Sequence, residues 1–158
     1  MEKMMVTPIG TLAVSDSEAM ILIAEEYRAG LTGLADFSYV QVLWWFDRCD
    51  TKDCRLHLTE EQPYVHGPEL LGTFATRSPM RPNPIALSCA EITYVDLEKG
   101  EIGLTYIDAL DGSPVLDLKP YTPSLDRVET PSVPEWCEHW PNSVETSGEF
   151  DWEKEFNF

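Results

Sequence analysis

Apolar residues in this chain come in short runs that are separated by turn-forming residues. Ile102, Leu104 and Tyr106 alternate with small or polar residues, which is the period-two pattern of a strand. Other runs are rich in β-branched and aromatic residues, which favour strands over helices. The pattern predicts strands within Met5–Val14, Ala19–Tyr27, Ser38–Phe46, Leu70–Thr76, Ile85–Leu97, Ile102–Leu110 and Val115–Tyr121.

Three stretches interrupt this strand pattern. Leu31–Phe37 has apolar residues three apart and predicts a short helical turn, with Thr32 as its N-cap. Cys49–Gly67 is polar and predicts a long loop. After Thr122 the chain is rich in proline, acidic and aromatic, so we expect an irregular tail. Large aromatic side chains are costly to leave in water, so three tryptophans favour partial docking of this tail: Trp136, Trp140 and Trp152.

Many short strands joined by tight turns, with little helix, favour a closed barrel or a strongly curved sheet. We therefore expect a mainly β fold: a compact β-barrel with short helical segments and an irregular C-terminal tail. The predicted domains are a barrel over residues 1–122 and a proline-rich, acidic, aromatic tail over residues 123–158.

Composition and charge narrow the class of protein. The 158 residues are 43% apolar, which is enough to bury a core. The chain has no run of about 18 apolar residues and no signal-peptide pattern, so we expect a cytoplasmic protein without a membrane span. The formal net charge is −17, from 28 acidic and 11 basic residues. This acidity repels polyanions and disfavours nucleic acid as a partner.

The cysteines and histidines give little indication of a metal site. Cys49 and Cys54 form a loose C-x4-C pair with His57 and His66 downstream, and no second close pair follows. Cys89 lies in an apolar run, and no export signal accompanies the cysteines. We expect reduced thiols and no metal.

The segment Gly72–Ser88, "GTFATRSPMRPNPIALS", is the strongest candidate for a binding element. Its three prolines restrict the backbone and hold each preceding residue extended. Arg77, Arg81 and Asn83 therefore sit on a stiff chain, where an arginine can present its planar fork to a carboxylate or phosphate. From the residues alone, a binding loop and a stiff connector whose arginines pair with the many acids are equally supported.

A second polar cluster surrounds the turn "DGSP". Asp108, Asp111, Asp117 and Lys119 lie close to it in the sequence. These carboxylates suit ribose hydroxyls or a cation, or ion pairs with the arginines of the first segment. No Ser-His-Asp order, P-loop or G-x-G-x-x-G fingerprint is visible, and none of the three histidines falls in a motif.

Three segments, in this order, resemble the TsaA-like family, also called the TrmO family: "GLTGLADFSYVQVLWWF", "GTFATRSPMRPNPIALS" and "DALDGSPVLDLKPY". The similarity covers roughly Leu31–Tyr121. It implies a β-barrel methyltransferase that uses S-adenosyl-L-methionine and is typically a homodimer. The best-known family members methylate threonylcarbamoyladenosine in tRNA.

The resemblance also implies positions for a site. The implied cofactor-binding residues are Phe46, Asp47, Arg48, Arg77, Leu87, Val115, Leu116, Asp117 and Leu118. Arg81 and Asn83 are expected to frame the cofactor residues and to face the substrate. No catalytic residue is identified, and methyl transfer requires no covalent nucleophile on the protein.

The sequence departs from the family pattern at three points. A segment with Pro-Arg-Gln that follows the first strand in tRNA-modifying relatives is missing here, and Asp47 stands where relatives often have histidine. The acidic tail replaces the extra C-terminal domain of some bacterial members. Three hypotheses follow: methylation of tRNA, methylation of a small molecule, or a non-catalytic binding or regulatory module.

Overall fold

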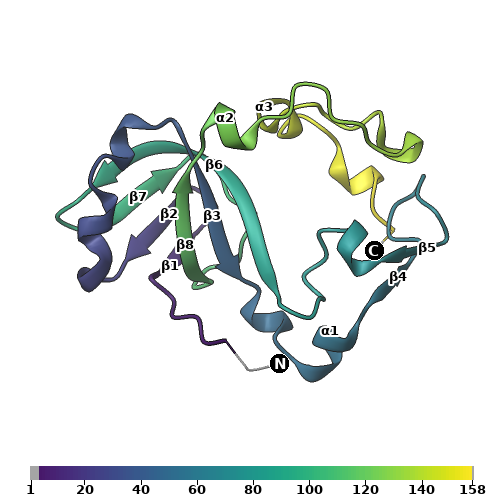
Figure 1. Cartoon of the computed structure of the whole chain (residues 1–158), viewed down its shortest axis with the longest axis horizontal. Coiled ribbons are helices and arrows are strands. Elements are labelled where there is room, and N and C mark those ends of the chain that lie inside the picture. The colour runs from purple at the N-terminus through teal and green to yellow at the C-terminus, as the bar shows by residue number, and fades with distance from the viewer. Residues whose placement is uncertain (1–3, 158) are drawn as a thin grey trace. The chain divides into compact units, whose positions relative to one another are not determined.

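Six strands pair edge to edge and close into an antiparallel barrel in the computed structural model, which describes residues 4–157 (Figure 1). Around the barrel the order is β1-β2-β7-β6-β3-β8. The strands are β1 (Gly10–Val14), β2 (Ala19–Ile23), β3 (Tyr39–Trp45), β6 (Ile85–Asp96), β7 (Glu101–Leu104) and β8 (Pro114–Pro120). The expectation of a mainly β barrel with short helical segments is confirmed.

Strand β3 pairs with β6 on one side and with β8 on the other. Its burial alternates, with Val40, Val42 and Trp44 facing the core. The residues between them stay half-buried, which agrees with a strand too apolar for one fully wet face. Trp44 is buried, and its Nε1 donates a 3.0 Å hydrogen bond to Ser88 Oγ on β6, so its polar group is satisfied.

The barrel interior is filled by branched aliphatic side chains from alternating strand positions. Such alternation follows from the pleat, which sends successive side chains to opposite faces. The most deeply buried of these residues are Leu12, Ile21, Val40, Val42, Ile102 and Val115, each 0–1% exposed.

Gly103 on β7 allows a close approach between two strands. A Cβ atom at this position would lie 2.2 Å from Tyr94 Cε1 and 2.5 Å from Thr93 Oγ1. The register of β6 shifts between Ile92 and Tyr94, which is the signature of a bulge. Only glycine leaves room for the Tyr94 ring beside β7.

The strand predicted over Ala19–Tyr27 ends at Ile23. A 3-10 helix, η1 (Glu25–Leu31), follows it, and η2 (Leu34–Asp36) comes next. Thr32 closes η1 rather than opening the next turn, because its Oγ1 donates to the Ala29 carbonyl at 3.0 Å. The prediction of Thr32 as an N-cap was therefore wrong.

The chain folds into two compact units, each built from two stretches of sequence. The first contains the barrel and comprises residues up to Asp50 together with Pro84–Arg127. The second comprises Thr51–Asn83 and the residues from Val128 onward. The domain boundary predicted at residue 122 remains a prediction, whereas the two compact units divide at other points of the chain.

The long loop predicted over Cys49–Gly67 was wrong. The structure places η3 (Asp47–Cys49) at its start, followed by helix α1 (Lys52–Leu56) and strand β4 (Thr59–Glu61). Thr51 caps α1, since its Oγ1 accepts a 3.2 Å hydrogen bond from the Cys54 N–H. Strand β4 pairs with β5 (Leu70–Gly72), and η4 (Thr73–Ala75) takes the place of the rest of the predicted 70–76 strand.

The C-terminal part has only short helices: α2 (Pro123–Asp126), η5 (Glu135–Cys137), α3 (Val144–Ser147) and η6 (Trp152–Lys154). Its aromatic rings pack within the second unit, where Trp136 stacks on Tyr64 at 5.0 Å and Trp140 meets the same ring edge-on at 5.2 Å. A bridge between Tyr64 and Phe156 brings the end of the chain to the same place (Figure 1). The expectations of an irregular tail and of partial docking are confirmed.

None of the helices within residues 4–157 has both the length and the apolar character that crossing a membrane would require.

Candidate functional site

The part of the candidate binding segment that belongs to the second unit, residues 72–83, is held in place by hydrogen bonds. Arg81 Nε donates to the Ser78 carbonyl at 2.7 Å. One terminal nitrogen of the same guanidinium donates to the carbonyls of Thr76 at 2.8 Å and Thr73 at 3.3 Å. Arg55 makes a fourth hydrogen bond, in which its Nη1 donates to the Pro82 carbonyl at 2.7 Å. These hydrogen bonds hold the loop in one shape, and the role of Arg81 beside a cofactor or substrate stays a prediction.

Arg77 lies on the exposed side of this frame and lines a groove of about 360 Å³. Aromatic side chains form much of the groove: Tyr64, Phe74, Trp136 and Trp140. Phe74 is 82% exposed, so the groove has an apolar rim that is open to solvent. An arginine beside aromatic rings can take a carboxylate while the rings take a flat base.

Tyr64 is the buried aromatic residue among those that line the groove. Burial raises the pKa of Tyr64, and the backbone N–H of Arg77 partly offsets that rise. Tyr64 therefore stays protonated at neutral pH, as a neutral hydrogen-bonding group. Asn83, the third residue predicted in this segment, is exposed.

In the barrel unit, two predicted residues share a row on the outer face. Leu43 of β3 is the register partner of Leu87 on β6 and of Asp117 on β8. Directly opposed residues of antiparallel strands point to the same side of the sheet. Leu87 is 47% exposed, and Asp117 pairs with Lys119 at 2.7 Å. The row offers an apolar surface next to a carboxylate.

Phe46, Asp47 and Arg48 lie where β3 passes into η3. The Phe46 N–H donates to the Pro84 carbonyl at 2.8 Å, and its ring packs edge-on against Trp44 at 4.5 Å. Asp47 and Arg48 are exposed. Phe46 is therefore anchored in the barrel wall, and the two charged residues face solvent.

The four predicted β8 residues differ in their surroundings. The Val115 side chain is fully buried in the core, and its carbonyl accepts a 2.8 Å hydrogen bond from the Ile9 N–H. Leu116 falls at an irregularity in the pairing of β8 with β3, and it is half-buried like Leu118. Any contact that Val115 makes with a ligand must come from its backbone.

Asp111 has a structural role in the turn before β8. Its Oδ1 accepts a 3.0 Å hydrogen bond from the Val14 N–H at the end of β1. Of the acids near this turn, Asp117 is the one that shares the outer row with Leu43, and Asp108 is exposed.

Sequence reasoning missed Tyr64 and the part that the tail tryptophans play in the groove. Their hydrophobicity indicated docking, but nothing local to them indicated the surface on which they dock.

The cysteines considered for a metal site do not form one in the described part of the chain. The one group of residues there whose ligand atoms are close enough to share a metal ion includes His66, and Cys49, Cys54 and His57 are not in it.

The chain is similar in sequence to a known protein family. Residues 2–127 match the sequence model of the tRNA-methyltransferase O N-terminal domain. An S-adenosyl-L-methionine-binding protein of Archaeoglobus fulgidus is 39% identical over 114 residues, which are 72% of this chain and 76% of that protein. The human tRNA (adenine(37)-N6)-methyltransferase is 37% identical over 123 residues, but these are only 27% of its length.

A solved structure shares the fold. The crystal structure of TrmO from Pseudomonas aeruginosa superposes with a TM-score of 0.63 and 26% identity. The superposition covers 83% of this chain and 62% of that one, so this chain spans less than two thirds of the solved relative.

Proposed function

Because the chain belongs to the tRNA-methyltransferase O family, we propose that it is an S-adenosyl-L-methionine-dependent methyltransferase. The observation that carries this proposal is the position of Arg77. This exposed arginine of the candidate binding segment lines an aromatic groove, on a loop that the hydrogen bonds of Arg81 hold in one shape. A rigid arginine loses little conformational entropy when it binds.

The chemical groups of the cofactor fit the side chains available here. Its methionyl carboxylate suits the Arg77 guanidinium, and its adenine suits aromatic or aliphatic surfaces. The ribose hydroxyls suit a carboxylate such as Asp117, which lies beside Leu43 and in one row with Leu87. Arg77 and the groove belong to the second unit and the Leu43 row to the first, so each is tested as a binding surface by itself.

When bound, S-adenosyl-L-methionine supplies a methyl group on a positively charged sulfur, and the sulfur leaves as a neutral thioether once a nucleophile takes the methyl. The protein's part is to orient the acceptor in line with that group and to exclude water, so positioning provides much of the rate. An acidic surface is compatible with a sulfonium cation.

The acceptor that the family indicates is an adenine in tRNA, the base named in the human relative's activity. We propose it as the first substrate to test. The net charge of −17 opposes a polyanion, and a small-molecule acceptor is the alternative that this charge favours.

One observation favours a second candidate, a non-catalytic binding or regulatory module. Strands β1 and β2 are joined by a tight turn, in which the Ser15 N–H donates to the Glu18 carbonyl at 2.8 Å. This turn leaves no place for the Pro-Arg-Gln segment of tRNA-modifying relatives. In that case the cofactor would be sensed rather than consumed.

Two measurements separate these functions. Isothermal titration of the purified full chain with S-adenosyl-L-methionine tests cofactor binding, and no binding by folded protein would refute the methyltransferase and the cofactor sensor alike, leaving only a module in which the motif is structural. Mass spectrometry of tRNA nucleosides from a deletion strain, with and without complementation, tests activity. A methylated nucleoside that disappears and returns supports the tRNA enzyme, whereas unchanged tRNA leaves the small-molecule acceptor or the binding module.

We also propose that the protein is cytoplasmic, as the sequence pattern indicates, and a homodimer, as the resemblance implies. Light scattering coupled to size-exclusion chromatography tests the dimer, because a single species at the 17.9 kDa monomer mass would refute it. Fractionation of the native host tests the compartment.

A further inference from the structure

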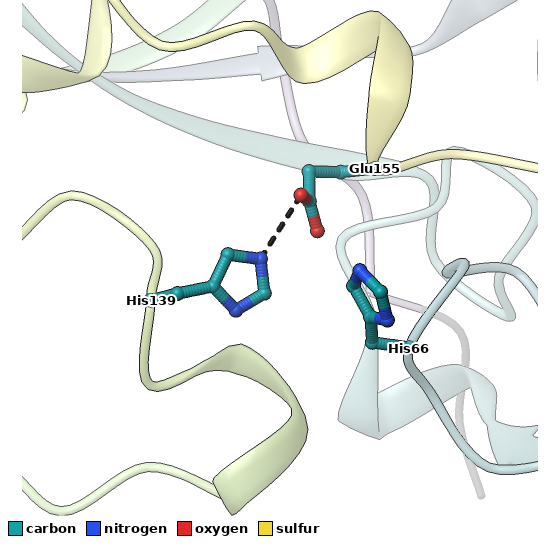
Figure 2. A group of neighbouring side chains, drawn as sticks. All are labelled: His66, His139 and Glu155. Atoms are coloured by element: carbon teal, nitrogen blue, oxygen red, sulfur yellow. Dashed lines mark ion pairs between the residues drawn. The ribbon is translucent and has the colours of Figure 1, made fainter.

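Three side chains from distant parts of the sequence meet at one point of the second unit. His66 lies between β4 and β5, His139 follows η5, and Glu155 follows η6. One ligand atom from each lies within 4.8 Å of the other two. Figure 2 shows both imidazole rings turned toward the Glu155 carboxylate.

The carboxylate at the centre of this cluster is held in position. Glu155 is buried, and its Oε2 accepts a 3.0 Å hydrogen bond from Trp140 Nε1. Its Oε1 accepts from His139 Nε2 at 2.9 Å (Figure 2). A ligating carboxylate is commonly oriented by such an outer partner, so the Trp140 indole acts as a support for the site.

The two histidines are also packed rather than loose. Their rings meet edge-on with centroids 5.5 Å apart, and His139 lies 6.2 Å from the Phe150 ring. Both histidines are exposed, which leaves a route for an ion from solvent. The site thus combines one buried, anchored oxygen ligand with two accessible nitrogen ligands.

We propose that His66, His139 and Glu155 bind a divalent transition-metal ion, with zinc as the preferred one. Two imidazoles and one carboxylate, with a water in the fourth position, are a set that Zn²⁺ adopts in proteins. Ca²⁺ and Mg²⁺ prefer oxygen ligands throughout, so two nitrogen ligands disfavour them. This differs from the sequence-based expectation of no metal and is independent of the proposed methyl transfer.

The geometry requires only small side-chain movements. Ligands at about 2.0–2.2 Å from a tetrahedral zinc ion lie about 3.3–3.6 Å apart. The 2.9 Å between His139 Nε2 and Glu155 Oε1 must lengthen slightly when an ion takes the place of the hydrogen-bonded proton. One ligand atom from each of the three residues already lies within 4.8 Å of the others, and both histidines are exposed, so their rings have room to adjust. The bound ion would link three segments that have no covalent connection nearby, and so would stabilise the second unit.

The test uses the full chain, stripped with a chelator and titrated with zinc chloride in a buffer that does not bind metals. We expect one zinc ion per chain and a rise in melting temperature, with no comparable rise for Mg²⁺ or Ca²⁺. His66→Gln and His139→Gln should each weaken zinc binding by at least about tenfold. His57→Gln is the matched control, because His57 pairs with Glu60 at 3.0 Å in the same unit, outside the cluster.

Two outcomes would overturn the proposal. One is the absence of zinc binding by folded protein. The other is zinc binding that survives both His66→Gln and His139→Gln, which would place the ion on the thiols instead. Cobalt substitution gives a second readout, because the visible absorption of Co²⁺ should indicate tetrahedral coordination in the parent protein and change in His139→Gln. Circular dichroism of each variant shows whether it is folded.

Discussion

Arg81 donates a 2.8 Å hydrogen bond to the Thr76 carbonyl, the residue directly before Arg77. The same guanidinium also reaches the carbonyls of Thr73 and Ser78. Arg81→Ala leaves the half-buried Thr76 and Ser78 carbonyls without this donor, whereas the Thr73 carbonyl keeps its hydrogen bonds from the Thr76 N–H and Oγ1. The loss should lower the free energy of unfolding by about 1–3 kcal/mol. Thermal denaturation checks this value, and an unchanged melting temperature would contradict the frame role of Arg81.

Arg77→Ala should weaken S-adenosyl-L-methionine binding, and circular dichroism shows whether the variant is folded. Loss of a hydrogen bond to a charged group costs about 1.5–3 kcal/mol, which is about 10- to 100-fold in affinity. Isothermal titration measures the change. Arg127→Ala is the matched control, because Arg127 is an exposed arginine outside the signature segments. Equal affinities for both variants and the parent would refute the role of Arg77.

Gly103→Ala should destabilise the barrel. The new Cβ would overlap the Tyr94 ring and the Thr93 hydroxyl, and overpacking of this kind costs about 1–3 kcal/mol. Urea denaturation gives the loss. A second substitution, Tyr94→Ala, should restore part of the lost stability when it is added to Gly103→Ala, whereas Tyr94→Ala alone should not stabilise the parent. If the stability changes of the two substitutions simply add, the overlap is not the cause of the loss.

Ile21→Ala should cost about 2–5 kcal/mol, because Ile21 is fully buried in the barrel. Leu22→Ala provides a comparison on the same strand, where the side chain is 38% exposed and points outward. We expect a clearly smaller loss for Leu22→Ala in the same chemical denaturation experiment. Similar losses would mean that the inward and outward faces of β2 are assigned wrongly.

Asp96 should make the stability of the barrel depend on acid pH. Hydrogen bonds from the backbone N–H groups of Lys99 and Glu98 lower the pKa of Asp96 below its usual value of 3.8. Its contribution to stability is therefore complete above about pH 3.8 and is lost as the pH falls through the lower pKa of the folded state. Urea denaturation across this range should show the parent losing stability relative to Asp96→Asn.

Lys99→Ala is the control for this pH effect. It removes the 3.6 Å contact between Lys99 Nζ and the Asp96 carboxylate but keeps the Lys99 backbone N–H, which makes the largest contribution to the lowered pKa. Lys99→Ala should therefore retain most of the pH dependence. Its loss in this variant would assign the effect to the lysine charge.

The barrel could be predicted because its signals are local. Alternation at Ile102 and Leu104 and the β-branched runs mark strands within a few residues, since the pleat has a period of two. The sequence signals were weaker at the ends of strands and helices. Thr51, which caps α1, stood in a stretch that polar composition alone marked as loop.

The candidate binding segment, Gly72–Ser88, could be predicted only in part. Its prolines indicated a stiff backbone, and the structure adds the reason why it is stiff in one particular shape, the Arg81 guanidinium bound to carbonyls. From the residues alone the arginines could equally have paired with acids. A side chain's partner depends on which backbone groups the folded loop turns toward it.

Local pattern was thus enough for the class of fold, the approximate positions of the six barrel strands and the segment that identifies the family, but not for β4. The aromatic groove and the meeting of His66, His139 and Glu155 depended on packing between residues 64–77 and the C-terminal part of the chain. Hydrophobic periodicity reports on neighbours within one strand or helix, so it does not indicate contacts between residues this far apart in the sequence. They become neighbours because burying the tryptophans against Tyr64 brings their segments together, and only the folded chain contains that contact.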